Sequence, residues 1–232
     1  MALAGAGACV SLVGRDPGKL QDVSSALRAV NPEHEAAAIV ADVADSGAVS
    51  RAVAAARESA GPIHILINNA GQAASAPFLH TDEALWQRML NVNLTGAYLF
   101  TRAALSDMLA AGFGRVVNVA SMAGLRGAPY ISAYVASKHG LVGLTRALAT
   151  EVPSKGITVN AVCPGYTDTD IVQLAVRSIT EKTKRSTQEA RATLAAMNAQ
   201  GRLIQPEEVA HTVAWLCSAE ASGITGQAIE IT

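Results

Sequence analysis

Short apolar runs alternate with longer segments of helical spacing along the whole chain, and this alternation restricts the fold more than any other feature. The run at 63–67 is typical of a strand that is covered on both faces. After Pro17, the apolar positions recur at helical spacing: Leu20, Val23, Leu27 and Val30. Strands that alternate with helices predict an α/β fold, a doubly wound parallel sheet with helices on both faces.

The expected elements follow one another in the order of a single domain. Strands are predicted at 10–13, 37–41, 63–67, 116–120, 158–163 and 228–231. Helices are predicted at 17–30, 46–60, 82–111, 132–151 and from 206 onward. The more polar stretch 166–203 is expected to form a helical lid, and no repeat, linker or low-complexity segment divides the 232 residues.

The charge balance gives no electrostatic reason to expect nucleic acid or an anionic membrane as a partner. The formal net charge is -1 and 50% of the residues are hydrophobic, which suits a globular domain with a sizeable core. The cysteines Cys9, Cys163 and Cys217 form no C-x-x-C pair, so neither a zinc site nor a disulfide framework is expected. We also expect no metal cofactor, and low cysteine use is typical of a cytoplasmic protein.

The apolar stretch 1–14 resembles a signal peptide only superficially, because it lacks the basic segment with which signal peptides begin. No uncharged run reaches the ~18 residues of a membrane-spanning helix. These observations predict a cytoplasmic protein without a membrane partner.

Tyr134 and Lys138 are four residues apart in a predicted helix, so their side chains share one face about one turn apart. An ammonium held beside a phenol favours the phenolate, which predicts a pKa of Tyr134 below the usual value near ~10. Such a phenol can act as a general acid or base near neutral pH. Ser121 follows the run 116–120, at the carboxyl end of a predicted strand, where open α/β sheets place their ligands.

Five motifs occur together in a fixed order: N-N-A-G at 68–71, N-V-N-L-T-G at 91–96, Ser121, Y-V-A-S-K at 134–138 and C-P-G at 163–165. A single Y-x-x-x-K is a weak signal, but the combination is specific. Over residues 9–232 the chain resembles the short-chain dehydrogenase/reductase family. The resemblance implies a Rossmann-like fold and an NAD(P)-dependent oxidoreductase that interconverts a ketone and a secondary alcohol. It is nearest to 3-oxoacyl-thioester reductases (3-oxoacyl-CoA or acyl-carrier substrates) or 3-hydroxyacyl dehydrogenases.

The resemblance implies four catalytic residues. Tyr134 would protonate the substrate oxygen, and Lys138 would lower the pKa of Tyr134 and bond the ribose hydroxyls of the cofactor. Ser121 would hydrogen-bond the substrate carbonyl. Asn93 is preferred to Asn91, because the family's asparagine-leucine-any-glycine pattern falls on 93–96, and it would hold a water that passes protons to Lys138.

The resemblance also implies a set of cofactor-binding residues. Besides Tyr134 and Lys138, they are Arg15, Asp42, Val43, Asn69, Ala70, Gly71, Pro164, Gly165, Thr167 and Thr169. Asp42 has an alternative interpretation as a helix cap. Gly14 stands where an NAD-specific enzyme carries an acidic residue, and Arg15 next to it can pair a 2′-phosphate, so NADP(H) is favoured over NAD(H).

The sequence departs from the family at its beginning. A glycine-rich turn of the form T-G-x-x-x-G-x-G is absent, and Gly5 and Gly7 are interpreted as a helix end. The family's first strand lies between the strands predicted at 10–13 and 63–67, so its loss leaves two inward-facing strand edges unpaired. We expect a sequence shortened at both ends relative to the family. A protein that is genuinely this short should bind dinucleotide weakly or not at all.

The expected partners are a small carbonyl or alcohol substrate and further copies of the chain. A homodimer or homotetramer would form through the helices at 82–111 and 132–151 and the last strand. Residues 171–203 carry six Lys or Arg against two Asp or Glu, an excess that suits either the phosphates of coenzyme A, an acidic carrier, or a solvated lid. The alternative function is a catalytically impaired family member that acts as a non-enzymatic subunit of an oligomer.

Overall fold

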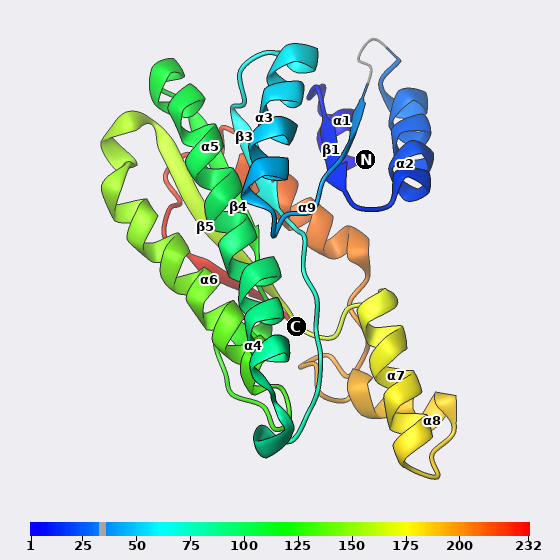
Figure 1. The fold of residues 1–232 in the computed structure, drawn as a ribbon. Helices are drawn as coiled ribbons and strands as arrows, with labels where there is room; N and C mark the ends of the chain where they lie inside the picture. The colour runs from blue at the N-terminus through cyan, green and yellow to red at the C-terminus, as the bar shows by residue number, and fades with distance from the viewer. Residues whose placement is uncertain (33–35) are drawn as a thin grey trace.

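A computed structural model describes residues 1–32 and 36–232, and in it every strand pair is parallel (Figure 1). The strands lie in two sheets. The first contains β1 (Ser11–Gly14) and β2 (Ala37–Val40), and the second has the order β3 (Ile65–Asn68), β4 (Gly114–Val119), β5 (Ile157–Pro164) and β6 (Ala228–Ile231). The predicted α/β class and the parallel pairing are confirmed, with the sheet divided into these two parts.

Helices cover both faces of the strands. The helices are α1 (Ala2–Gly5), α2 (Pro17–Val30), α3 (Ser46–Ala60), α4 (Glu83–Leu90), α5 (Gly96–Ala111), α6 (Ser132–Glu151), α7 (Asp170–Lys182), α8 (Thr187–Ala195) and α9 (Pro206–Cys217). α5 and α6 pack on β3, β4 and β5, and α3 packs against α5, whereas α9 packs on β4 and β5 from the other side. α7 and α8 lie together at one corner of the molecule, away from the sheet (Figure 1).

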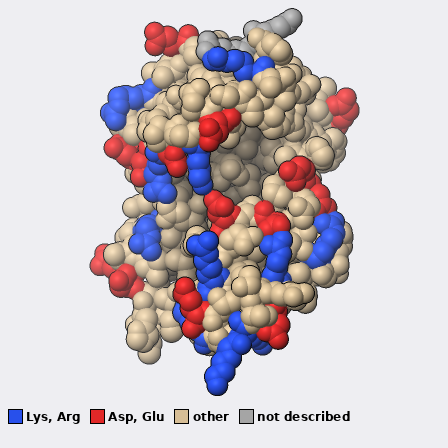
Figure 2. Space-filling view, turned by 90° about the vertical axis from the view of Figure 1, so that its right-hand side faces the viewer, with Lys and Arg blue, Asp and Glu red and all other residues tan. Residues whose placement is uncertain are grey.

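No pairing joins β1 to β3 within the described residues, so the prediction of two unpaired strand edges is confirmed. The exposure of the side chains agrees with the break. All residues of β5 are buried, while all residues of β1 and β3 are only partly buried. Seen from the side of α2, the molecule has a deep hollow whose rim carries charged side chains of both signs (Figure 2).

The helix predicted over 82–111 is interrupted by a π-helical turn, Asn91–Thr95, that the sequence did not indicate. Gly96, directly after this π-helical turn, is closely packed, since a Cβ there would approach the Val43 carbonyl oxygen to 2.9 Å. Such turns occur often at functional sites. The strand predicted at 63–67 is found at Ile65–Asn68, and the carbonyl of the exposed His64 before it still accepts from the Arg115 N–H at 2.9 Å.

A buried polar network joins the central strands to the helices above them. The Asn68 amide donates to Thr101 Oγ1 at 3.0 Å and to Asn118 Oδ1 at 2.8 Å, and the Asn118 amide donates to Thr145 Oγ1 at 2.8 Å. Because buried polar groups without partners are costly, this pairing fixes β3 and β4 relative to α5 and α6. In the part of the chain that the structure describes, no helix is long and apolar enough to cross a membrane.

Candidate active site

The predicted catalytic residues meet where β3, β4 and β5 end. Ser121 follows β4, and Tyr134 and Lys138 lie on α6, which packs against β5 and the turn Met122–Gly124. Gly71 follows β3, and Gly165 follows β5. The carboxyl ends of neighbouring parallel strands therefore bring together residues that are far apart in the sequence.

Ser121, Tyr134 and Lys138 form a compact cluster. The Ser121 hydroxyl is hydrogen-bonded to the Tyr134 phenol, and Lys138 Nζ lies 5.9 Å from the centroid of the Tyr134 ring. Lys138 is 4% exposed, and its ammonium donates to the Val119 carbonyl at 2.8 Å. The prediction that Tyr134 and Lys138 share one helix face is confirmed.

The predicted acidity of Tyr134 is wrong for this structure. Burial raises the pKa of the phenol, and the hydrogen bond with Ser121 acts in the opposite direction without reversing the shift. The ammonium of Lys138 is itself disfavoured, because burial lowers the pKa of Lys138 to about 8. Desolvation of both groups therefore outweighs the pairing effect expected from their spacing.

Asn93 is 1% exposed, while Asn91 is exposed, which agrees with the choice of Asn93. Its side-chain oxygen accepts from the Gln72 N–H at 2.8 Å, and its amide donates to the Gln72 carbonyl at 2.9 Å and to Ser137 Oγ at 3.0 Å. A Cβ on Gly71 would lie 3.4 Å from Asn93 Oδ1 and 3.5 Å from Lys138 Nζ. Asn93 and Lys138 thus flank the same short segment of backbone.

Ser137 is a residue of this site that the sequence analysis missed. It is fully buried, accepts from Asn93 and donates to the Tyr134 carbonyl at 2.8 Å, so it connects the π-helical turn to α6. Its position inside Y-V-A-S-K was the available signal.

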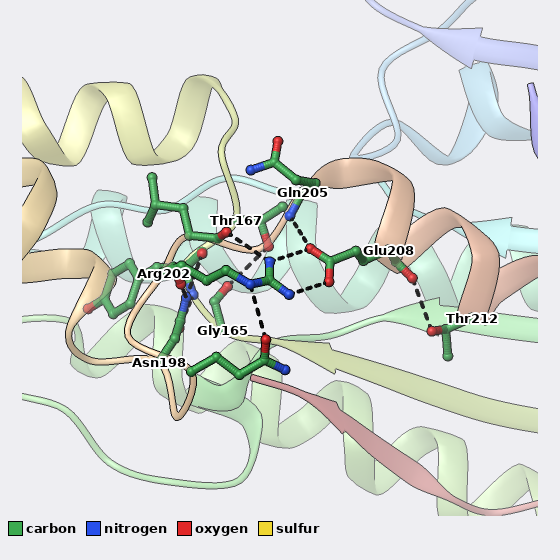
Figure 3. A network of polar contacts seen from close by, with 10 residues as sticks. Gly165, Thr167, Asn198, Arg202, Gln205, Glu208 and Thr212 are labelled. Atoms are coloured by element: carbon green, nitrogen blue, oxygen red, sulfur yellow. Dashed lines mark hydrogen bonds and ion pairs between the residues drawn. The ribbon is translucent and has the colours of Figure 1, made fainter.

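The segment after β5 is held by Asn198, a second residue that the sequence analysis missed. Asn198 accepts from the Tyr166 N–H and donates to the Tyr166 carbonyl, both at 2.9 Å, and it also donates to the Arg202 carbonyl at 2.7 Å. Arg202 in turn makes two bonds of 2.7 Å to the carboxylate of Glu208 at the start of α9 (Figure 3). This pair lowers the pKa of Glu208 to about 2. Because Asn198 bonds the backbone of Tyr166, the network holds the Gly165–Thr167 backbone in place.

Gly165 is required by this network, and substitution by alanine is expected to lower kcat/KM at least tenfold. A Cβ there would lie 2.3 Å from Asn198 Oδ1, so either Asn198 or the Gly165–Thr167 backbone must move. Overpacking of this kind costs about 1–3 kcal/mol of stability. The control is Gly143→Ala on α6, where nothing lies within 4 Å of the added methyl. Unchanged kcat/KM and melting temperature in Gly165→Ala would contradict the prediction.

The remaining predicted cofactor residues differ in their exposure. Arg15 is exposed just after β1, and Thr169 is exposed at the start of α7. Asp42 accepts from the Ala44 N–H at 2.9 Å, whereas Asp45 caps α3. The alternative interpretation of Asp42 as a helix cap is therefore wrong. Among the residues that the structure describes, no cluster of three or more His, Cys, Asp or Glu side chains could hold a metal ion.

Comparison with known proteins identifies the family. A family model described as "Enoyl-(Acyl carrier protein) reductase" matches residues 1–232. The chain belongs to the short-chain dehydrogenase/reductase family. It is an oxidoreductase of the class that acts on CH–OH and ketone groups.

Several members of this family are similar to the chain over most of its length. Acetoacetyl-CoA reductase of Shinella zoogloeoides is 39% identical over 188 residues, which cover 81% of this chain and 74% of that protein. Cis-4-hydroxycyclohexanecarboxylate dehydrogenase of Sinomonas cyclohexanicum is 38% identical and is covered to 80%, with 90% of this chain aligned. A crystal structure of an actinorhodin polyketide ketoreductase variant with NADPH superimposes with a TM-score of 0.94 at 36% identity, covering 99% of this chain and 88% of that one.

The residues present fit one half of a nicotinamide dinucleotide. Lys138 has three N–H donors and uses one on Val119, so two remain for the hydroxyls of a ribose. For the pyrophosphate of the dinucleotide, neither α1 nor α2 offers a free helix N-terminus as a binding site. α1 is only four residues long, and the first turn of α2 is capped by the carboxylate of Asp16, which accepts from the Lys19 N–H.

Proposed function

We propose that the chain reduces the ketone of a 3-oxoacyl thioester to a secondary alcohol, with NADPH as the preferred reductant. The observation that carries this proposal is the cluster of Ser121, Tyr134 and Lys138 at the carboxyl ends of the strands. The similarity to acetoacetyl-CoA reductase and to a polyketide ketoreductase supports the substrate class.

Each catalytic group has a role that follows from its position. The bound cofactor would supply the hydride. Ser121 donates a hydrogen bond that holds the substrate carbonyl beside Tyr134, and the phenol gives its proton to the carbonyl oxygen as charge develops there. The raised pKa of Tyr134 keeps the phenol protonated and ready to act as the acid of the reduction. Asn93 and Lys138 lie on the path by which the phenol is reprotonated.

Arg15 supports the preference for NADPH over NADH. It is exposed directly after β1, beside Gly14, and its acidic neighbour Asp16 caps α2 by accepting from the Lys19 N–H. We expect Arg15→Ala to raise the KM for NADPH by about 10- to 100-fold, the worth of a charge-assisted bond to phosphate, and to leave the KM for NADH nearly unchanged. Arg88→Ala, an exposed arginine on α4, is the control. An equal change for both cofactors would contradict the assignment.

The basic side chains of the lid, residues 166–203, indicate which of its groups could bind the phosphates of an acyl carrier. Arg191 is paired with Asp168 and Arg202 with Glu208, so two of its six basic residues are neutralised within the protein. Arg177, Lys182, Lys184 and Arg185 are exposed. We propose that these four side chains meet the phosphates of a coenzyme A or acyl-carrier thioester at the mouth of the site.

The direct test is oxidation of NADPH or NADH by the purified protein in the presence of acetoacetyl-CoA, followed by absorbance. We expect turnover that depends on the thioester and is faster with NADPH. Absence of turnover with either cofactor, together with absence of cofactor binding by fluorescence titration, would favour the second candidate, a non-enzymatic subunit. The observation behind that candidate is the missing pyrophosphate site in α1 and α2.

We also propose that the chain forms a homodimer or homotetramer through the helices α4 to α6 and the last strand. Large apolar side chains on α5 and next to it are exposed, among them Tyr98, Leu109 and Phe113. Analytical ultracentrifugation measures the state of assembly directly.

A further inference from the structure

A cavity of ≈ 440 Å³ lies at the end of the sheet opposite the catalytic cluster. Its lining residues lie around the ends of α5 and α6 and the starts of β4 and β5. Figure 1 shows the ends of α5 and α6 at its upper left. The lining of the cavity includes Phe113, Arg115, Gly156, Thr158, Ser222 and Thr225. None of these residues takes part in the reaction proposed above, because the catalytic groups follow the opposite ends of the same strands.

Arg115 is the unusual member of this lining. The residue is 4% exposed, and no carboxylate of residues 1–32 or 36–232 forms an ion pair with it. Its Nη1 donates to the carbonyls of Gly114 at 2.8 Å and Gly156 at 3.2 Å, and its Cζ lies 4.5 Å from the centroid of the Phe113 ring. Nε is buried without a hydrogen-bond partner. Burial lowers the pKa of this guanidinium, as expected for a cation without a counter-charge.

The remaining donors around the cavity suit an anion. Nη2 of Arg115 makes no hydrogen bond with a described residue and is not enclosed as Nε is. Thr158 is the partner of Arg115 in the parallel ladder between β4 and β5, so both side chains stand on the same face of the sheet. Thr225 Oγ1 accepts from the Val159 N–H at 3.1 Å, which leaves its own O–H free to donate.

We propose that this cavity binds a small oxyanion, a carboxylate or a phosphate, with Nη2 of Arg115 as the principal donor and the hydroxyls of Thr158 and Thr225 as further donors. A guanidinium offers only donors, and carboxylate and phosphate oxygens are the acceptors that it binds most strongly. The bound anion supplies the negative charge that Arg115 lacks among the residues that the structure describes. The site is independent of the catalytic cluster and of the nucleotide.

The test follows Arg115 itself. Protein labelled with ¹⁵N-arginine is titrated with inorganic phosphate, acetate and chloride at constant ionic strength, and the Nε–H signals are recorded by NMR. The Arg115 signal is identified by its loss in Arg115→Lys. We expect this signal to move in a saturable way with phosphate or acetate, and less with chloride. Movement with phosphate alone or with acetate alone tells which oxyanion the site takes.

Variants separate this site from phosphate binding elsewhere. Thr158→Val keeps the shape and the arginine but removes one donor, and should raise the dissociation constant up to about tenfold. Phosphate should raise the melting temperature of the wild type and of Arg51→Met, an exposed control on α3, but not that of Arg115→Met. If Arg115→Met does not fold, the NMR titrations of the wild type and of Thr158→Val test the proposal without it. A stationary Arg115 signal, or phosphate stabilisation that survives in Arg115→Met, would overturn the proposal.

Discussion

Replacement of Tyr134 by phenylalanine is expected to lower kcat for acetoacetyl-CoA reduction by about 100- to 10,000-fold, the range of a lost general acid. The substitution removes one oxygen and keeps the ring, which Lys138 approaches to 5.9 Å from its centroid. The fold and the walls of the site should therefore remain. Because the phenol acts on charge that develops in the transition state, the change should fall on kcat more than on KM.

The measurement is the initial rate of NADPH oxidation over a range of thioester concentrations, with cofactor binding recorded separately. The control is Tyr130→Phe, which removes a phenol from an exposed loop residue near the same helix. Tyr130→Phe should keep most of the rate. Equal rates for Tyr134→Phe and the wild type would remove Tyr134 from the mechanism, whatever the cofactor preference proves to be.

Replacement of Lys138 by methionine is expected to abolish most activity and yet to raise the melting temperature at pH 7 by a few degrees. Burial lowers the pKa of Lys138 from 10.5 to about 8, a shift that corresponds to about 3 kcal/mol of cost for the charged form. Methionine has a similar length without the charge. Part of the gain is lost, because the Val119 carbonyl then lacks its donor.

The stability difference between Lys138→Met and the wild type is expected to depend on pH. Unfolded Lys138 keeps its proton up to about pH 10.5, whereas in the folded protein the pKa is about 8. The folded state therefore carries the full cost below pH 8 and loses it as the pH rises toward 10.5. The stability gap between Lys138→Met and the wild type should shrink over that interval. A constant gap, or a destabilised variant at pH 7, would contradict the prediction, and Lys155→Met, on an exposed lysine, controls for net charge.

Local signals in the sequence were enough to predict most elements. α3 has the predicted bounds, because Asp45 caps its start and Gly61 ends it with a φ of 77°, and both signals lie in adjacent residues. α6 also has the predicted bounds, and its Tyr134 and Lys138 share one face as their spacing requires. The position of Ser121 after β4 followed from the order of strands and helices.

The parts of the site that the sequence could not reveal depend on distant contacts. The π-helical turn at 91–95 contains Asn93, which bonds the backbone of Gln72, 21 residues earlier. Asn198 holds Tyr166 across 32 residues, and no motif marks that pairing. The direction of the Tyr134 pKa shift depends on burial by the whole fold rather than on Lys138 alone.

The interruption between β1 and β3 has a consequence for the way in which this protein unfolds. Among the described residues, the sheet of β1 and β2 shares no hydrogen-bonded ladder with the sheet that carries the catalytic groups. Backbone cooperativity is therefore not continuous between the two sheets. Amide hydrogen exchange should reveal two units, with β1 and β2 opening at lower free energy than β4 and β5. A single melting temperature would then average two transitions. The sheet with the catalytic cluster could stay folded under conditions in which the β1–β2 sheet and Arg15 have already unfolded.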